Sequence, residues 1–367
     1  KIIFEVQKFF IGMAFSPPSR DSFTARILNV LMTDDGKRGI VPTYSSSAGG
    51  GLKFFQRGLI SPDSKLSLSV TAGLRDRRRF QLHFKRIALS KIINSEILAK
   101  YHFQPDESFF GLGPNSARDD RSNFAHELVR ADLDIGFRLN EQNRIAILPG
   151  FDRNKILAGR DDAYPSATEV PGFESLPGMN STVQIAKLEL EIHHDSRNHP
   201  GIPTAGFEAL LRGGVFQEVS GDRFGFTRLK MEVSRFIHLF YNRALKLRVA
   251  GELTGQFQDR SIPFYYLSEI GRSETVRGFT RGRFRDKDMI LGSIEYRYPV
   301  WNIINTYFFL DEGTVANNIF KDLSAKNLKQ GYGIGFQMWD AEGVLMDFTI
   351  ARSREGMRFY LELNTIF

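Results

Sequence analysis

Three charged residues in the C-terminal part of the sequence have types and spacing that suit an ion-pair cluster: Arg277, Glu295 and Asp311. Arg277 lies in a basic, glycine-bearing stretch without periodicity, which predicts a loop. An arginine guanidinium presents its donors in a planar fork, and two carboxylates can accept from it in a bidentate manner. We expect the three side chains to meet inside a β-barrel, either as a purely structural staple for the loop or as a group that handles a substrate directly.

Both acids lie in segments that alternate in polarity. Along residues 288–300, apolar side chains occupy one parity, and the other parity contains Glu295 and Arg297. In the next segment Asp311 shares its parity with Phe309 and Gly313. A period of two predicts strands with two different faces, so each strand carries one acid on its more polar face.

The same rhythm recurs along most of the chain and predicts sixteen strands, an even number as expected for a barrel whose two ends lie on one side. The predicted strands are 23–32, 44–56, 65–74, 79–89, 94–104, 122–138, 143–155, 181–195, 204–217, 224–240, 244–257, 288–300, 305–315, 331–340, 344–352 and 357–367. We therefore expect an all-β, 16-stranded antiparallel transmembrane β-barrel over residues 23–367. Residues 1–22 are expected to form a pre-barrel segment, in which 8–16 has the pattern of one further strand.

Alternation alone fits both a soluble sandwich and a membrane barrel, because only the direction of the two faces differs. The connections favour the barrel: short ones such as 139–143 and 340–343 alternate with long ones such as 105–121 and 258–287. The mean hydropathy is only −0.25, and no stretch approaches 18 uncharged apolar residues, so no membrane helix is predicted. The chain has no cysteine, which excludes disulfides and thiolate chemistry. Its formal net charge of +7 fits either simple solubility or attraction to anionic partners.

Four sequence motifs resemble those of the bacterial surface antigen superfamily, the BamA/TamA-type outer-membrane barrels that assemble or translocate proteins. The motifs are the VRGF loop tip (Val276, Arg277, Gly278, Phe279) with the strand acid Glu295, the FxDxG strand (Phe309, Asp311, Gly313), the periplasmic turn (Asp195, Arg197, Asn198, Pro200, Pro203, Gly206) and the terminal Phe367. Together with an FFGLGP loop at 109–114, they extend the resemblance over residues 105 to 367.

The resemblance implies that the 258–287 loop folds back into the lumen, that Arg277 meets Glu295 and Asp311 on the inner wall, and that the first and last strands form a seam able to open laterally. It implies a factor for outer-membrane protein insertion or polypeptide transport in a Gram-negative cell outer membrane. The alternatives are a passive pore, with the loop as a plug, and an accessory or structural barrel in a larger complex. About 22 residues precede the predicted barrel, too few for one periplasmic POTRA domain, so the resemblance is closest to members that lack these domains; we also expect Lys1 to be a processed or trimmed end.

The expected partners are outer-membrane lipids and lipopolysaccharide, client polypeptides or a partner complex, and a second copy of the chain in a homo-oligomer; no nucleic acid is expected. We expect no enzyme activity, cofactor or metal, since the sequence has no HExxH motif, no Walker loop and no GxSxG elbow.

Three other sequence features are weaker signals of function: a histidine group, a basic run and a glycine run. The His193, His194 and His199 group is a weak metal-site signal, because the turn motif already explains it. The basic run Arg75, Arg77, Arg78 and Arg79 fits a solvated loop better than a site for lipid A phosphates. The glycines Gly331, Gly333 and Gly335 precede no helix, so they predict a strand where the backbone needs room rather than a nucleotide loop.

Overall fold

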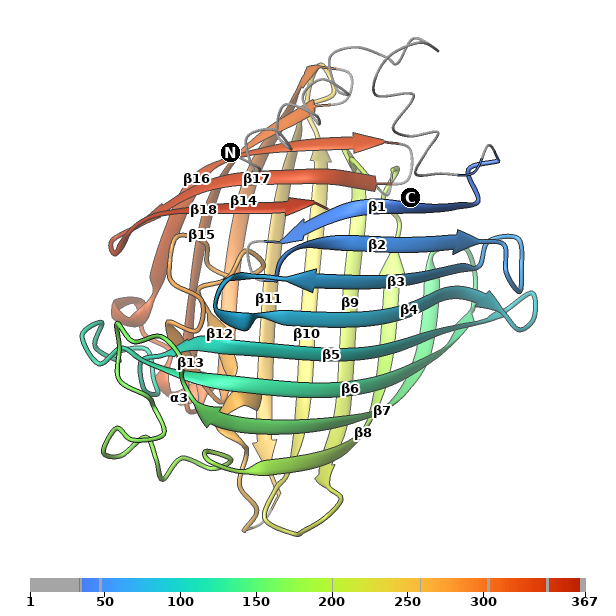
Figure 1. Ribbon diagram of the computed structural model, residues 1–367. Coiled ribbons are helices and arrows are strands. Elements are labelled where there is room, and N and C mark those ends of the chain that lie inside the picture. Colours follow the sequence, from blue (N-terminus) through green and yellow to red (C-terminus); the bar gives the residue numbers. More distant parts are fainter. Residues whose placement is uncertain are drawn as a thin grey trace.

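The computed structural model describes residues 33, 35–45, 48–199, 201–257, 259–301, 304–340 and 343–363. Sixteen antiparallel strands close into one barrel, as predicted, with neighbours in chain order along the wall (Figure 1). The barrel strands are β1 (Arg38–Ser45), β2 (Gly49–Arg57), β3 (Lys65–Ala72), β4 (Arg78–Ala88), β5 (Ile93–Phe109), β6 (Ser122–Arg138), β7 (Asn143–Ala158), β8 (Thr182–Asp195), β9 (Gly206–Glu218), β10 (Gly225–His238), β11 (Ala244–Gln256), β14 (Asp288–Trp301), β15 (Ile304–Ala316), β16 (Lys329–Asp340), β17 (Gly343–Ser353) and β18 (Gly356–Leu363).

The start of the barrel differs from the prediction. The segment expected as strand 44–56 contains the end of β1, a turn and β2, so that prediction was wrong in merging two strands. Pro42 interrupts the strand pattern of β1, and glycines at 49–51 remove side chains from the start of β2, which hides the boundary. The expected strand 23–32 and the expected pre-barrel segment 1–22 lie outside the described residues.

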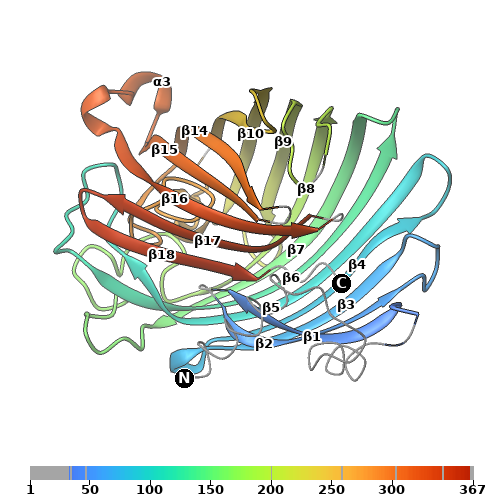
Figure 2. The same cartoon turned by 90° about the horizontal axis from the view of Figure 1, so that it is seen from above.

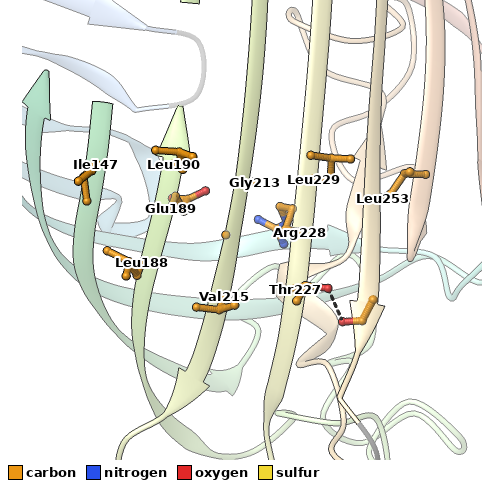
Figure 3. A pocket seen from close by; sticks show the side chains of 12 residues that line it. Ile147, Leu188, Glu189, Leu190, Gly213, Val215, Thr227, Arg228, Leu229 and Leu253 are labelled. Atoms are coloured by element: carbon orange, nitrogen blue, oxygen red, sulfur yellow. Dashed lines mark hydrogen bonds between the residues drawn. The ribbon is translucent and has the colours of Figure 1, made fainter. Parts of the chain in front are cut away.

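The two faces of the wall are reversed relative to a soluble protein. Leu188 and Leu190 are each 51% exposed, whereas Glu191 on the same strand is buried. Figure 3 shows this alternation on β8, where Leu188 and Leu190 flank Glu189, and on β10, where Leu229 follows Arg228. An apolar outer face with charges inside is the arrangement of a membrane-spanning barrel. Within the described ranges, no helix is long and apolar enough to cross a membrane.

The described residues of β1 pair with strands on both of its sides. β1 pairs with β2 at every position from Arg38 to Ser45. Against β18 it pairs, within the described residues, at Tyr44 with Leu363 and at Ser45 with Glu362. Figure 2 looks at the barrel from above, with β1 and β18 on the same side of the wall. The barrel therefore closes where β1 meets β18, and the chain after Leu363 lies outside the described residues.

The connection between β11 and β14 contains its own small structures: the 3-10 helix η2 (Phe264–Tyr266) and a two-stranded sheet of β12 (Ser268–Ile270) and β13 (Phe284–Asp286). We call residues 257–287 the long loop. The other short helices lie in connections: η1 (Leu74–Asp76), α3 (Ile319–Asp322) and η3 (Ala325–Asn327).

The long loop contacts walls on several sides of the barrel. Its Tyr266 bonds to Asp152 on β7, Arg281 to Glu107 on β5, and the backbone of Gly278 to Tyr360 on β18. The long loop therefore extends across the barrel from one side of the wall to another. Figure 1 is consistent with this path, with β12 and β13 drawn between the two sides of the wall.

Candidate functional site

Arg277 lies at the point where the long loop meets β14 and β15, and the structure brings it together with Glu295 and Asp311. Its Nε and one terminal nitrogen donate to the two carboxylate oxygens of Asp311, each at 2.7 Å. The same terminal nitrogen lies 3.1 Å from Glu295 Oε1, and the Arg277 backbone N–H donates to Asp311 at 3.2 Å. The exposed fractions are 7% for Arg277, 5% for Glu295 and 0% for Asp311, so the cluster is buried.

The two acids depend on Arg277 to different degrees. Glu295 also accepts two bonds from Arg297, at 2.9 and 2.7 Å, and Lys246 lies 4.0 Å away. Asp311 has one other side-chain donor, Ser293, at 2.6 Å. Burial alone would lower the pKa of Arg277, but the hydrogen bond and charge of Asp311 outweigh burial and raise this pKa above its ordinary value. The guanidinium therefore stays charged, and Asp311 is the acid that it neutralises.

Aromatic rings form the floor under the guanidinium. The centre of the Phe309 ring lies 3.5 Å from the Arg277 guanidinium carbon, a cation–π contact, and the Tyr307 ring lies at 5.7 Å. Phe309 in the FxDxG motif therefore stacks on the same arginine that Asp311 binds. The last motif residue, Gly313, leaves room for Val276, because a Cβ at this position would lie 2.9 Å from a Val276 methyl group.

Three glycines on β16 make space for this cluster. A Cβ on Gly331 would lie 1.9 Å from the Arg277 carbonyl oxygen, and one on Gly335 would lie 2.0 Å from the Tyr307 ring. A Cβ on Gly333 would lie 2.0 Å from a backbone oxygen on β17 and 2.9 Å from the Phe309 ring. The prediction that these glycines mark a closely packed strand is confirmed.

The tip of the motif reaches the last strand. Gly278 has φ +94°, a conformation that favours glycine, and its backbone N–H donates to the Tyr360 hydroxyl at 3.0 Å. Its carbonyl accepts from Ser353 at 2.7 Å. Phe279 is buried and packs edge-on against Phe284 on β13, with 5.5 Å between ring centres. The loop tip is therefore held by the strands that end at the seam.

A second anchor, which sequence reasoning missed, fixes the other end of the long loop. Tyr266 donates to Asp152 Oδ2 at 2.8 Å, and Arg130 binds the same carboxylate at 2.7 and 2.8 Å. Asn154 donates to the Tyr266 hydroxyl at 3.1 Å, and Lys187 lies 3.3 Å from Asp152. Burial raises the pKa of Tyr266 well above its ordinary value, so the phenol remains a donor. The only sign of this anchor in the sequence was that Asp152 lies among the polar, inward-facing positions of β7.

A third anchor joins the long loop to two external connections. Arg283 binds both carboxylate oxygens of Glu355, each at 2.9 Å, in the turn between β17 and β18. It also donates to the hydroxyl and carbonyl of Ser116, at 3.0 and 2.9 Å. In the FFGLGP stretch, the backbone N–H of Gly113 donates to the carbonyl of Arg285 at 2.8 Å. The 109–114 motif therefore packs on the long loop.

The predicted turn motif forms a hydrogen-bonded turn between β8 and β9. Arg197 binds both oxygens of Asp195, at 2.8 and 2.7 Å, and the Asn198 side chain accepts from two backbone N–H groups, at 3.0 and 3.1 Å. Pro203 is buried at its base. Gly206 has φ +114°, and a Cβ there would lie 2.4 Å from a backbone oxygen. Pro200 and Phe367 lie outside the described residues.

The histidine group and the basic run both form contacts within the protein. His193 faces Glu208, and His194 bonds to Asn143 and Ser196. Among the described residues, no group of three or more His, Asp or Glu side chains is placed to hold a metal ion. In the basic run, Arg75 and Arg77 bind Asp106, at 3.2 and 2.8 Å, so both turn inward to a carboxylate.

Comparisons with known proteins agree with this geometry. The Omp85 superfamily domain matches residues 44–363. The crystal structure of BamA from Haemophilus ducreyi lacking POTRA domains 1–3 is similar, with a TM-score of 0.62 and 17% identity, over 89% of this chain and 69% of that one.

Two CdiB structures are also similar in fold. CdiB from Acinetobacter baumannii gives a TM-score of 0.54 at 11% identity, over 88% of this chain and 58% of that chain. CdiB from Escherichia coli gives 0.55 at 12% identity, over 88% and 61%. This chain thus spans less than two thirds of either CdiB chain. The resemblance inferred from the loop and strand motifs is confirmed, and the chain belongs to the Omp85 superfamily.

Proposed function

We propose that this barrel inserts or translocates polypeptides in the outer membrane of a Gram-negative bacterium. The observation that carries the proposal is the seam itself: the first and last barrel strands, β1 and β18, meet at Tyr44–Leu363 and Ser45–Glu362, and the tip of the long loop binds Tyr360 on β18. If the two strands part, each exposes an unpaired edge, which is a template on which another polypeptide can add a strand.

The long loop supports the same function because it couples the lumen to the seam. Its tip binds Tyr360 on β18, while Arg277, one residue earlier in the chain, binds Asp311 on β15. Movement of β18 away from β1 would therefore act on the loop tip. In this proposal the Arg277 cluster is the fixed point that holds the loop inside the barrel while the seam changes.

Site-specific crosslinking tests this proposal. A photoreactive amino acid replaces Tyr44, at the seam edge of β1, and in a second protein it replaces Phe54 on β2, which pairs with β3 at Leu68. Both positions lie on the outer face of the wall. The probe is a small outer-membrane barrel protein, presented unfolded to each variant in lipid vesicles.

The proposal expects crosslinks to the unfolded probe from position 44 and far fewer from position 54, and it expects the crosslinks from position 44 to disappear once the probe has folded. Equal labelling at both positions would contradict a role for the seam. A steady, large single-channel conductance without any probe crosslinking would instead favour a passive pore.

A further inference from the structure

Some cations on the inner wall have carboxylate partners and others do not. This difference determines where an anion could bind in the lumen. On the side formed by β8 to β11, several cations have carboxylate partners: Lys187 lies 2.7 Å from Asp132, and Arg248 lies 2.7 Å from Glu232. Arg212 pairs with Glu191, and Arg228 with Glu252 at 3.3 Å. The charges of these four cations are therefore neutralised by carboxylates of the wall itself.

The wall formed by β4 and β5 is different. Arg79 pairs with His102 across the ladder, and Gln81 pairs with Lys100. Register partners and residues two apart on a strand lie on the same face, so Arg79 and Lys100 point to the same side of the wall. The neighbouring Phe80 and Tyr101 lie on the opposite, outer face, where the centres of their rings are 5.9 Å apart. Arg79 and Lys100 are both half-buried, so they line the interior without being sealed from it.

Each carboxylate on β4 and β5 already has a cationic or histidine partner. Glu96 lies 3.3 Å from His83, Asp106 is bound by Arg75 and Arg77, and Glu107 lies 3.4 Å from Arg281. Across the ladder Lys100 faces another cation, Arg130, whose guanidinium is engaged by Asp152. In the part of the chain that the structure describes, neither Arg79 nor Lys100 has a carboxylate at ion-pair distance.

The long loop adds a third cation to this wall. The positive charge of Arg281 acts on both Arg79 and Lys100, while the negative charge of Glu362 on β18 acts on Arg79 and that of Glu107 acts on Lys100. Arg281 has Glu107 as a partner, but among the described residues Arg79 and Lys100 have no carboxylate at ion-pair distance. Like charges in a partly desolvated space repel one another and are costly to hold without counter-charges. An anion that enters the lumen is stabilised here more than at the neutralised wall.

We propose that Arg79, Lys100 and Arg281 form a binding site for carboxylate-rich polypeptide segments that enter the barrel. This inference deepens the proposed function, on which it rests, by naming the chemistry that the lumen prefers in a polypeptide. Carboxylates suit the site because the two wall cations are adjacent on neighbouring strands, and an extended acidic segment can place successive side chains along them.

A binding measurement in detergent solution tests the site without requiring insertion activity. The probes are a fluorescent, unstructured glutamate-rich peptide and its glutamine-rich counterpart, followed by fluorescence anisotropy. The variants are Lys100→Gln and Arg79→Gln. The matched control is Lys230→Gln, which removes the same charge from the inner wall of β10, where the register partner is Glu252. Heat-modifiable gel mobility verifies that each variant is folded.

The site predicts that the glutamate-rich peptide binds more tightly than the glutamine-rich one and that added salt weakens this binding. It predicts a loss of about fivefold in affinity for each wall variant and no change for the control, since one close charge pair in a wet site is worth about that factor. Equal affinity for both peptides, or an equal loss in Lys230→Gln, would overturn the proposal. Full displacement by inorganic phosphate at matched charge would assign the site to small anions instead.

This outcome is separable from that of the seam experiment. A barrel that crosslinks unfolded clients at position 44 but binds both peptides equally would keep the proposed function and lose the acidic preference. A barrel that binds the acidic peptide but never crosslinks a client would keep the anionic site and lose the polypeptide-insertion role.

Discussion

Replacement of Arg277 by alanine is the perturbation whose consequence the structure defines most closely. The change removes both bonds to the carboxylate oxygens of Asp311, the bond to Glu295 and the stacking on Phe309. Asp311 is fully buried and would keep a single side-chain donor, Ser293. Glu295 would keep both bonds from Arg297. The cost therefore arises mainly at Asp311.

Breaking a buried ion pair by removing one partner costs about 3–5 kcal/mol, because the remaining charge is uncompensated. We expect Arg277→Ala to reach this range in the free energy of unfolding. Arg277→Lys keeps the charge but not the planar fork, so it should recover only part of the loss. A double-mutant cycle should give a coupling of about 2–3 kcal/mol for Arg277 with Asp311 and about 1 kcal/mol or less for Arg277 with Glu295.

Two assays report the effect. Guanidinium unfolding in detergent gives the free energies, and trypsin cleavage at Arg272 and Arg281 reports release of the long loop, since both lie within it. We expect Arg277→Ala and Asp311→Ala to cleave rapidly and Glu295→Gln to resemble the unmodified protein. Unchanged stability together with unchanged protease resistance of Arg277→Ala would refute the argument, as would a larger coupling to Glu295 than to Asp311.

Three further changes test other parts of the account. Gly331→Val should expose the long loop to trypsin, because even a Cβ there would lie 1.9 Å from the Arg277 carbonyl oxygen; retained resistance would show that the strand can yield. Tyr266→Phe should destabilise the barrel by about 1–3 kcal/mol in guanidinium unfolding, since it removes a buried donor to Asp152, and no change would mean that the second anchor is dispensable. Leu190→Arg on the outer face should cost about 2–4 kcal/mol in vesicles near the bilayer midplane, whereas Leu190→Phe should cost little; equal costs would contradict a lipid-facing position.

The sequence was sufficient to predict the barrel because alternation marks each strand independently of its neighbours. It also identified the Arg277 cluster, since the parity of Glu295 and Asp311 places both acids on the inner face of adjacent strands. The first strand was missed for a local reason: Pro42 disturbs the pattern in β1, and the following turn runs into glycines that carry no polarity.

The second anchor could not be predicted for a different reason. Alternation shows which face Asp152 occupies but not the height in the barrel at which the loop brings Tyr266 to it, because that depends on the register of several strands together. The same limit applies to Arg75 and Arg77, whose spacing looked like a solvated loop until the fold placed Asp106 beside them. Partners that meet across many strands require the three-dimensional structure.

A disulfide across the seam tests whether β1 and β18 must separate for the barrel to insert a polypeptide. The chain has no cysteine, so Tyr44→Cys with Leu363→Cys, a register pair of β1 and β18, can form a single disulfide across the seam. Phe54→Cys with Leu68→Cys, a register pair of β2 and β3, is the control. Insertion of an unfolded outer-membrane barrel protein into vesicles is compared for the oxidised and reduced forms of both proteins. We expect the oxidised seam variant to lose insertion activity and to regain it on reduction, with no effect of oxidation on the control. Full activity of the oxidised seam variant would contradict the account.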